Sequence, residues 1–270
     1  MQRLTQVLCF CTASSPPLPL PLAEYPLNVC KHQNNTIWQL LSTDRVVTPV
    51  SDLATVIAET KANGIPFFIG EGNSIACGGQ AGVSDVMAAA LWAVDALFAH
   101  AEAGVARWNF HGCPEGAYTA IAYANASDDA PDVRPLYYGA YAFTVAARGE
   151  LYRATISSSN ELVRAHVART SDGTWTAVVV HKDPKAAAPA RVTLRLPRDA
   201  SRGAGSLTRL LAPRNDPFAK TGLTFAGQTW DGTRDGTPSG ARVVEKVVAA
   251  ADGSFSFDVP PASVAVLSFV

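Results

Sequence analysis

Charged side chains are scarce in this chain. Asp, Glu, Lys and Arg make up 17% of its 270 residues, and the formal net charge is −1. An average soluble domain is roughly 25% charged. Without a surplus of cations or a basic stripe, the chain lacks the electrostatic attraction on which non-specific nucleic-acid binding depends. We therefore expect no nucleic-acid partner.

Long hydrophobic runs are absent as well. The longest, Met87 to Ala99, is interrupted by Asp95 and falls short of the roughly 20 residues that cross a bilayer. Near the N-terminus, Val7 to Phe10 is shorter than the core of a signal peptide, and Ser14 to Pro21 alternates proline with leucine, which excludes a helix. We interpret residues 1–22 as a disordered leader or an artefact of where the reading frame begins, and we expect no membrane partner.

Motifs for metals and phosphates are also missing. The histidines form no H-x-x-x-H pair and the cysteines no C-x-x-C pair, so we expect no metal site and no cofactor. The segment Gly78 to Gly82 is rich in glycine but lacks the Gly-Lys-Ser/Thr of a phosphate loop. The cysteines are Cys9, Cys11, Cys30, Cys77 and Cys113.

The first half of the chain alternates short apolar runs with helical patterns. We expect a helix from an N-cap at Ser51 to Lys61, a second one capped by Ser84-Asp85 and ended by Gly104, and a third over Leu136 to Ala147. Buried strands are expected at Ile65–Ile69 and Val105–Phe110. Strand and helix in alternation indicate parallel β/α units.

After about residue 150 the pattern changes to short alternating strands separated by turns. This arrangement is typical of an antiparallel β-sandwich. The fold class is therefore α/β followed by all-β. The expected strands are Leu162–Val167, Thr174–Val180, Arg191–Leu196, Ser206–Leu211, Arg242–Val248, Ser254–Val259 and Ser263–Phe269.

Glu71 stands just after an apolar strand and just before a glycine-rich loop. Catalytic groups of parallel β/α folds gather at such strand ends, although a capping or ion-pairing acid is the more ordinary interpretation. His111 ends the next strand in the same way. Ser74 lies in a near match to the G-x-S-x-G elbow of serine hydrolases, but the helix that should follow it is not indicated.

Six segments stand out when they are read together. They are G-E-G-N-S-I-A-C-G-G-Q-A-G-V-S-D from Gly70, A-A-L-W-A-V-D-A-L from Ala89, W-N-F-H-G from Trp108, G-A-Y from Gly116, A-G-Q-T-W-D-G from Ala226 and P-P-A-S-V-A-V-L from Pro260. In combination they resemble glycoside hydrolase family 79, the retaining β-glucuronidases that include the heparanases. The resemblance covers about residues 24 to 270.

This resemblance implies a (β/α)8 barrel with a β-sandwich packed on it. Residues 23–149 would hold about barrel strands six to eight, and residues 150–270 the sandwich. Glu71 matches the nucleophile, which attacks the anomeric carbon while a second carboxyl roughly 5–5.5 Å away protonates the leaving oxygen. The implied substrate is a glucuronic-acid-containing carbohydrate, and the implied location is extracellular, although no convincing signal peptide is present.

The resemblance also implies contacts around that nucleophile. The loop of Cys77, Gly78 and Gly79 offers backbone N–H groups to the sugar carboxylate, and glycine lets the backbone approach a ligand closely. Tyr118 matches a tyrosine that contacts the same carboxylate. Tyr25 stands where a tyrosine hydrogen-bonds the nucleophile. Heparanases carry tyrosine in place of Cys77, so one side-chain contact is missing here.

Two further roles stay open at this point. His111 is either a substrate contact or an ordinary strand-end histidine. Cys77 and Cys113 both follow strand ends, so a disulfide between them is one hypothesis, although sequence alone does not fix a pairing.

The partner of Glu71 is missing. The family's acid/base is a glutamate preceded by asparagine upstream of the nucleophile, and the one Asn-Glu pair in this chain, Asn160-Glu161, lies downstream. A closed barrel needs about 200 residues. We therefore expect an incomplete enzyme with negligible activity, which oligomerises through the open barrel edge. The alternative is a non-catalytic module that binds carbohydrate or supports a partner protein.

Overall fold

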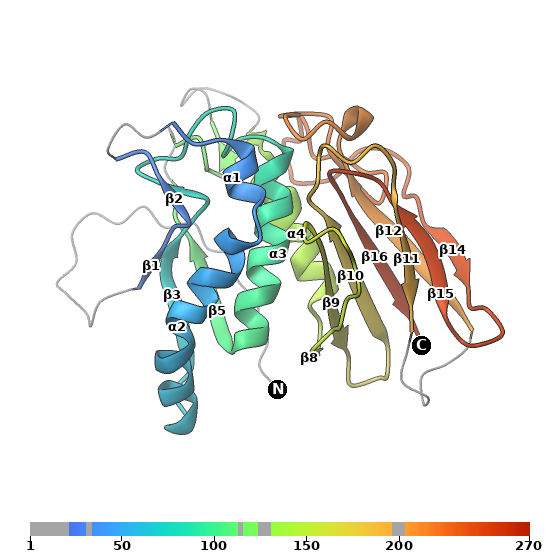
Figure 1. Cartoon of the computed structure of the whole chain (residues 1–270). Helices are drawn as coiled ribbons and strands as arrows, with labels where there is room; N and C mark the ends of the chain where they lie inside the picture. The colour runs from blue at the N-terminus through green and yellow to red at the C-terminus, as the bar shows by residue number, and fades with distance from the viewer. Residues whose placement is uncertain (1–21, 31–33, 113–115, 124–130, 196–202) are drawn as a thin grey trace.

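The computed structural model of the chain describes residues 22–30, 34–112, 116–123, 131–195 and 203–270. A parallel β/α part and an antiparallel β part lie side by side (Figure 1). The predicted fold class, α/β followed by all-β, is confirmed. Of the predicted leader, only Leu22 is described, and it packs against the core.

The β/α part is built on a three-stranded parallel sheet in the order β1-β3-β5, with α2 and α3 packed against it. Two small pairings, β2 with β4 and β6 with β7, lie beside it. The elements in chain order are β1 (Ala23–Glu24), β2 (Leu27–Asn28), α1 (Ile37–Leu41), α2 (Asp44–Ala62), β3 (Phe67–Gly72), β4 (Ile75–Ala76), α3 (Met87–Ala103), β5 (Val105–Phe110), β6 (Ile121–Ala122), β7 (Asp132–Val133) and α4 (Pro135–Ala146).

The helices differ from the prediction at their N-termini. Helix α2 begins at Asp44 and runs through Pro49, so Ser51 lies inside the helix and is not its cap. Helix α3 begins at Met87, and its N-cap residue Val86 makes no side-chain hydrogen bond. The two predictions are wrong at these ends. The predicted C-terminus of α3 is right, because Gly104 closes it with a left-handed φ of 108°.

Helix α3 is capped from the other half of the molecule. The N–H groups of Met87 and Ala88 donate to the carbonyls of Ala219 (2.8 Å) and Pro217 (3.0 Å). These bonds satisfy donors that a helix start leaves free. From Met87 to His100 every side chain of α3 is buried, since the helix lies between the parallel sheet and the antiparallel part. The alanine-rich sequence of this helix fits such close packing on all sides.

The antiparallel part holds a seven-stranded sheet in the order β13-β12-β16-β10-β9-β8, with β14 also paired to β12. A second sheet is formed by β11 and β15. Every strand predicted after residue 150 is present with small shifts of its ends. The elements are β8 (Glu150–Tyr152), β9 (Val163–Arg169), β10 (Trp175–His181), β11 (Ala190–Leu194), β12 (Ala204–Leu211), the 3₁₀ turn η1 (Pro213–Asn215), β13 (Thr224–Phe225), β14 (Glu245–Val248), β15 (Phe255–Val259) and β16 (Ser263–Phe269).

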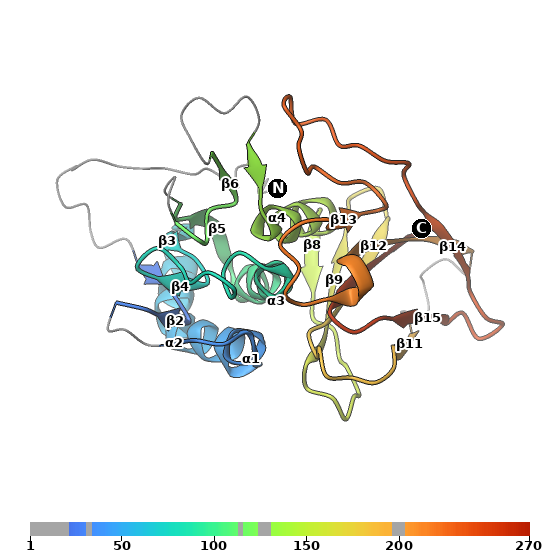
Figure 2. The ribbon, with the colours of Figure 1, turned by 90° about the horizontal axis from the view of Figure 1, so that it is seen from above.

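The large sheet is buried on both faces. Along β10, Val178 and Val180 belong to the core cluster shared with α3 and α4, whereas Ala177 and Val179 face the cluster between the two β-sheets. This is the two-residue period of a strand. The view from above in Figure 2 shows the helices on one side of the large sheet and β11 and β15 on the other. One hydrophobic core joins both parts, so the predicted domain boundaries, 23–149 and 150–270, stay a prediction.

No helix within the described ranges is long and apolar enough to cross a membrane.

Candidate active site

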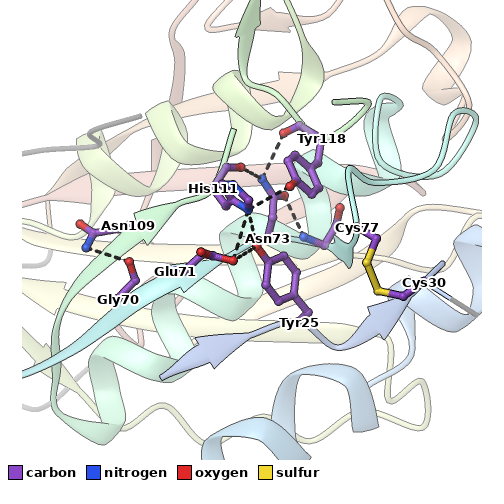
Figure 3. A network of polar contacts seen from close by, with 10 residues as sticks. Tyr25, Cys30, Gly70, Glu71, Asn73, Cys77, Asn109, His111 and Tyr118 are labelled. Atoms are coloured by element: carbon purple, nitrogen blue, oxygen red, sulfur yellow. Dashed lines mark hydrogen bonds and ion pairs between the residues drawn. A yellow bond between two sulfur atoms is a disulfide. The ribbon is translucent and has the colours of Figure 1, made fainter. Parts of the chain in front are cut away.

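Three predicted residues meet at the carboxyl ends of the parallel strands. Glu71 is the fifth residue of β3, Tyr25 directly follows β1, and His111 directly follows β5. The register pairs Ala23 with Glu71 and Gly72 with Phe110, so these ends lie at the same edge of the sheet. Figure 3 shows the three side chains converging there.

The contacts among these side chains are short. The Tyr25 hydroxyl donates to Glu71 Oε1 at 2.8 Å and lies 2.8 Å from His111 Nδ1. His111 Nδ1 is in turn 3.3 Å from Glu71 Oε1. The side chains of Glu71 and His111 are 44% and 36% exposed, so the carboxylate is open to solvent. No described residue hydrogen-bonds Glu71 Oε2, which leaves that oxygen available to a ligand.

Tyr25 is held in its protonated form. Burial raises the pKa of its hydroxyl, and the hydrogen bond to Glu71 and the charge of that carboxylate raise the pKa further. Tyr25 is therefore a fixed neutral donor at all ordinary pH values. Its hydrogen bond to Glu71 is the contact that the sequence resemblance implies for this tyrosine, and its role in orienting Glu71 stays a prediction.

Tyr118 lies next to both His111 and Tyr25, and its ring stacks on the Tyr25 ring with centroids 6.4 Å apart. Its hydroxyl is 3.0 Å from His111 Nδ1, and the residue is only 1% exposed. The structure thus places it in the same hydrogen-bonded cluster as Glu71, with its hydroxyl directed at His111. Its predicted contact with a sugar carboxylate stays a prediction.

Asn73 was not predicted, yet it ties the strand ends together. Its Nδ2 donates to the carbonyls of His111 (2.7 Å) and Tyr118 (3.2 Å), and its backbone N–H donates to Glu24 O (3.1 Å). The side chain is fully buried. A polar residue two positions past Glu71, in a loop start, was the available signal, but nothing in the sequence shows that it points inward.

The loop of Cys77, Gly78 and Gly79 is anchored on both sides. All three residues have positive φ values of 66°, 93° and 79°. Gly78 O accepts from Ala117 N at 2.7 Å. A Cβ on Gly79 would lie 2.8 Å from Tyr118 N, so only glycine fits there. The glycine is thus required for packing against Tyr118, whether or not the loop binds a ligand.

Cys77 forms a disulfide with Cys30. The hypothesis of a bond between Cys77 and Cys113 is therefore wrong, and Cys113 lies outside the described residues. The bond joins the end of the β2 segment to the loop after β4, two short strands that pair in parallel. It fixes the predicted carboxylate-binding loop beside the Glu71 cluster (Figure 3).

Glu24 faces away from this cluster. It pairs with Gly72, and strand alternation places its side chain on the opposite face from Tyr25 and Glu71. Burial, with a smaller contribution from the charge of Asp52, raises its pKa to about 7.

Two other chemistries find no support. Ser74 is fully buried, its hydroxyl donates to Ser84 Oγ at 3.0 Å, and strand β4 follows it instead of a helix, so it is no nucleophile elbow. Among the described residues, no three His, Cys, Asp or Glu side chains gather as they would around a metal ion.

Comparison with known proteins agrees with this architecture. Residues 152–267 match the glycosyl hydrolase family 79 C-terminal beta domain. A search of curated proteins finds no match. Among solved structures, a 4-O-α-L-rhamnosyl-β-D-glucuronidase from Fusarium oxysporum 12S, in complex with Rha-GlcA, is similar with a TM-score of 0.71 and 20% identity. The similarity covers 91% of this chain and 52% of that one.

Two arabinofuranosidases share the fold as well. The α-L-arabinofuranosidase from Thermotoga maritima has a TM-score of 0.60 at 14% identity, covering 88% of this chain and 50% of that one. The GH51 arabinofuranosidase from Xanthomonas axonopodis pv. citri has a TM-score of 0.60 at 13% identity, covering 91% and 51%. The chain thus spans about half the length of the structures it matches, and these likenesses concern the fold. The family to which residues 152–267 of this chain are similar is thus glycosyl hydrolase family 79, through its C-terminal β domain.

Proposed function

We propose that this chain carries the nucleophile side of a retaining glycoside hydrolase site that acts on glucuronic-acid-containing carbohydrates. Glu71 is the nucleophile, and Tyr25 orients it. The observation that carries the proposal is the half-exposed Glu71 carboxylate at the carboxyl edge of the sheet, with one oxygen held by Tyr25 and His111. The attached family 79 domain and the fold shared with a glucuronidase support it.

The chemistry follows from this geometry. The free oxygen of Glu71 attacks the anomeric carbon and displaces the leaving group, which gives a covalent glycosyl ester. The hydrogen bond from Tyr25 keeps the carboxylate oriented. Because the tyrosine stays neutral, it adds no charge beside the nucleophile. Gly78, whose missing Cβ faces open space, leaves the loop backbone accessible to the sugar carboxylate.

The first step also needs a general acid that protonates the leaving oxygen, and the second step needs a general base that activates the attacking water. No Asn-Glu pair precedes Glu71 in the sequence, and Glu71 is the only described carboxylate hydrogen-bonded into the cluster. General acid–base assistance contributes about 10²–10⁴-fold. We therefore expect the 270-residue chain to turn over ordinary glucuronides at a negligible rate, while the nucleophile itself remains competent.

A substrate whose leaving group needs no proton tests the nucleophile independently of the missing general acid. We expect 2-deoxy-2-fluoro-β-glucuronyl fluoride to form an ester with Glu71, seen as an adduct by intact-mass spectrometry and placed by peptide mapping. The Glu71→Gln variant should stay unlabelled, and the Glu24→Gln variant, altered on the opposite face of the same strands, should be labelled like the parent chain. A parent chain that stays unlabelled would reject the nucleophile and favour the non-catalytic module.

We further propose an extracellular location. The Cys30–Cys77 disulfide supports it, because such bonds persist in oxidising compartments. Asn34 lies in the sequon Asn34-Asn35-Thr36 and is exposed, as an N-glycosylated residue must be.

A further inference from the structure

Two large aromatic side chains meet on the surface, away from the Glu71 cluster. Trp38 of α1 is 42% exposed, and Phe218, three residues after η1, is 50% exposed. Their rings touch edge to face, with centroids 6.4 Å apart and planes at 80°. One ring comes from the β/α part and the other from the antiparallel part. The contact leaves about half of each side chain open to solvent, so that two aromatic rings lie exposed side by side.

A cation completes this surface. The ammonium of Lys185 lies 4.6 Å from the centre of the Trp38 ring. The nearest acid in the sequence, Asp183, is already used by Asn160 Nδ2 (2.8 Å) and by the backbone N–H of Lys185 (2.9 Å). Within the described part of the chain, the Lys185 ammonium has no carboxylate partner. It is exposed and free to bind an anion.

The three residues lie at the same end of the molecule as the candidate active site. The segment of Phe218 caps the N-terminus of α3 through Pro217 O and Ala219 O. Because α3 follows β3 in a parallel β/α unit, its N-terminus lies at the carboxyl edge of the strands, where Glu71 is. Figure 1 shows α1 and the start of α3 at that end.

We propose that Trp38, Phe218 and Lys185 form a subsite for a uronic-acid residue of an acidic polysaccharide, separate from the Glu71 cluster. The aromatic rings offer apolar faces for the C–H groups of a pyranose ring, and the ammonium pairs with the carboxylate of the same residue. The choice of an acidic polymer rests on the proposed function. A polymer bound here extends over the end of the molecule at which the Glu71 cluster opens.

Binding, measured without any turnover, tests this subsite. The probe is soluble β-1,4-polyglucuronic acid, titrated by isothermal calorimetry into the full chain, with neutral β-1,4-linked glucan as the comparison polymer. We expect the acidic polymer to bind at least about tenfold more tightly than the neutral one. Trp38→Ala, Phe218→Ala and Lys185→Gln should each weaken that binding about tenfold, or roughly 1.4 kcal/mol.

Matched controls lie elsewhere on the surface. Phe68→Ala and Lys61→Gln remove an exposed phenylalanine and an exposed lysine outside this surface, and should leave the affinity unchanged. Lys185→Gln, an exposed change, should leave the melting temperature unchanged and reduce the salt dependence of binding. Equal binding of both polymers, no binding of either, or no effect of the three substitutions would each overturn the proposal.

The two proposals fail separately. Labelling by the small glucuronyl fluoride reports only on Glu71, and we expect Trp38→Ala and Lys185→Gln to be labelled normally. Loss of labelling with intact polymer binding would reject the nucleophile alone.

Discussion

Glu71 and Asp95 are both acids within apolar sequence, and their surroundings could hardly differ more. Glu71 is 44% exposed, and its neighbours are a neutral tyrosine and a histidine at the open edge of the sheet. Asp95, on α3, is fully buried between the two parts of the molecule. It lies 2.5 Å from Lys182 Nζ, 3.1 Å from His166 Nε2 and 3.3 Å from Arg164 Nε.

The buried network is extended by a second acid. His166 is fully enclosed, and its Nδ1 lies 2.8 Å from Glu102 Oε1, so both of its ring nitrogens face carboxylates. Burial alone would raise the pKa of Asp95, but Lys182, His166 and Arg164 outweigh it and hold that pKa well below its usual value. The contact of Asp95 with Lys182 is an ion pair without the geometry of a directed hydrogen bond.

The comparison shows how the surroundings of the proposed nucleophile differ from those of a structural carboxylate. Asp95 is surrounded by basic side chains and closed to solvent. No substrate can reach it, and its charge is already paired with these side chains. Among the described residues, Glu71 Oε2 has no hydrogen-bond partner, and Oε1 contacts only a tyrosine and a histidine. Removing the carboxylate of Asp95 leaves buried positive charges without a counter-charge. Removing the carboxylate of Glu71 leaves only the Tyr25 hydroxyl without its acceptor.

The largest effect on stability is therefore expected at Asp95. Asp95→Asn leaves the buried Lys182 ammonium without its counter-charge, which typically costs about 3–5 kcal/mol. We expect such a loss in the free energy of unfolding, measured by urea denaturation followed by circular dichroism. Glu71→Gln, the matched change, should cost less than about 1 kcal/mol.

A double variant sharpens the same comparison. Asp95→Asn combined with Lys182→Met removes both charges, and part of the lost stability should return. Equal costs for Asp95→Asn and Glu71→Gln would show that the two carboxylates do not differ as described.

A smaller effect is expected at the disulfide. Replacing Cys30 and Cys77 together by serine removes a disulfide between residues separated by 47 positions in the sequence. A disulfide stabilises a fold by about 2–4 kcal/mol. The melting temperature of the parent chain should fall to that of the double variant on reduction. Labelling at Glu71 should weaken too, because the loop of Cys77 is anchored beside it.

The subtlest difference is a dependence on pH. Burial would lower the pKa of His166, but its hydrogen bonds to Asp95 and Glu102 outweigh this, and the pKa is raised above 6.5. The folded state thus binds the proton more tightly than the unfolded one. The stabilising contribution is fully present below pH 6.5 and is lost as pH rises through the raised value.

A pH series of unfolding free energies checks this. The difference between the parent chain and His166→Gln should be greatest near pH 6 and should shrink at alkaline pH. A difference that is constant from pH 6 to 9 would show that His166 does not change protonation in this range, and would contradict the prediction.

Much of the fold could be predicted from the sequence, because local patterns determine it. The strands after residue 150 follow from alternation, as Val178 and Val180 show on one face of β10 and Ala177 and Val179 on the other. Gly104 marked a helix end since its left-handed conformation is a local property.

Two of the errors involve partners distant in sequence. Helix α3 starts at Met87 because Ala219 and Pro217 accept its first N–H groups, and no local cap announces that. Cys77 pairs with Cys30 because β2 and β4 lie side by side. In the candidate site, Glu71, Tyr25 and His111 could be brought together by strand-end logic and family resemblance, whereas the buried direction of Asn73 could not.

The enclosure of α3 has a consequence for how the molecule comes apart. Such a helix cannot lose the antiparallel part without exposing side chains such as Phe98, which stacks on His166 of β9. The two parts should therefore melt in one cooperative transition, and proteolysis near residue 150 should release no stable half. The β/α part and the antiparallel part differ in architecture, but we expect them to fold and unfold together.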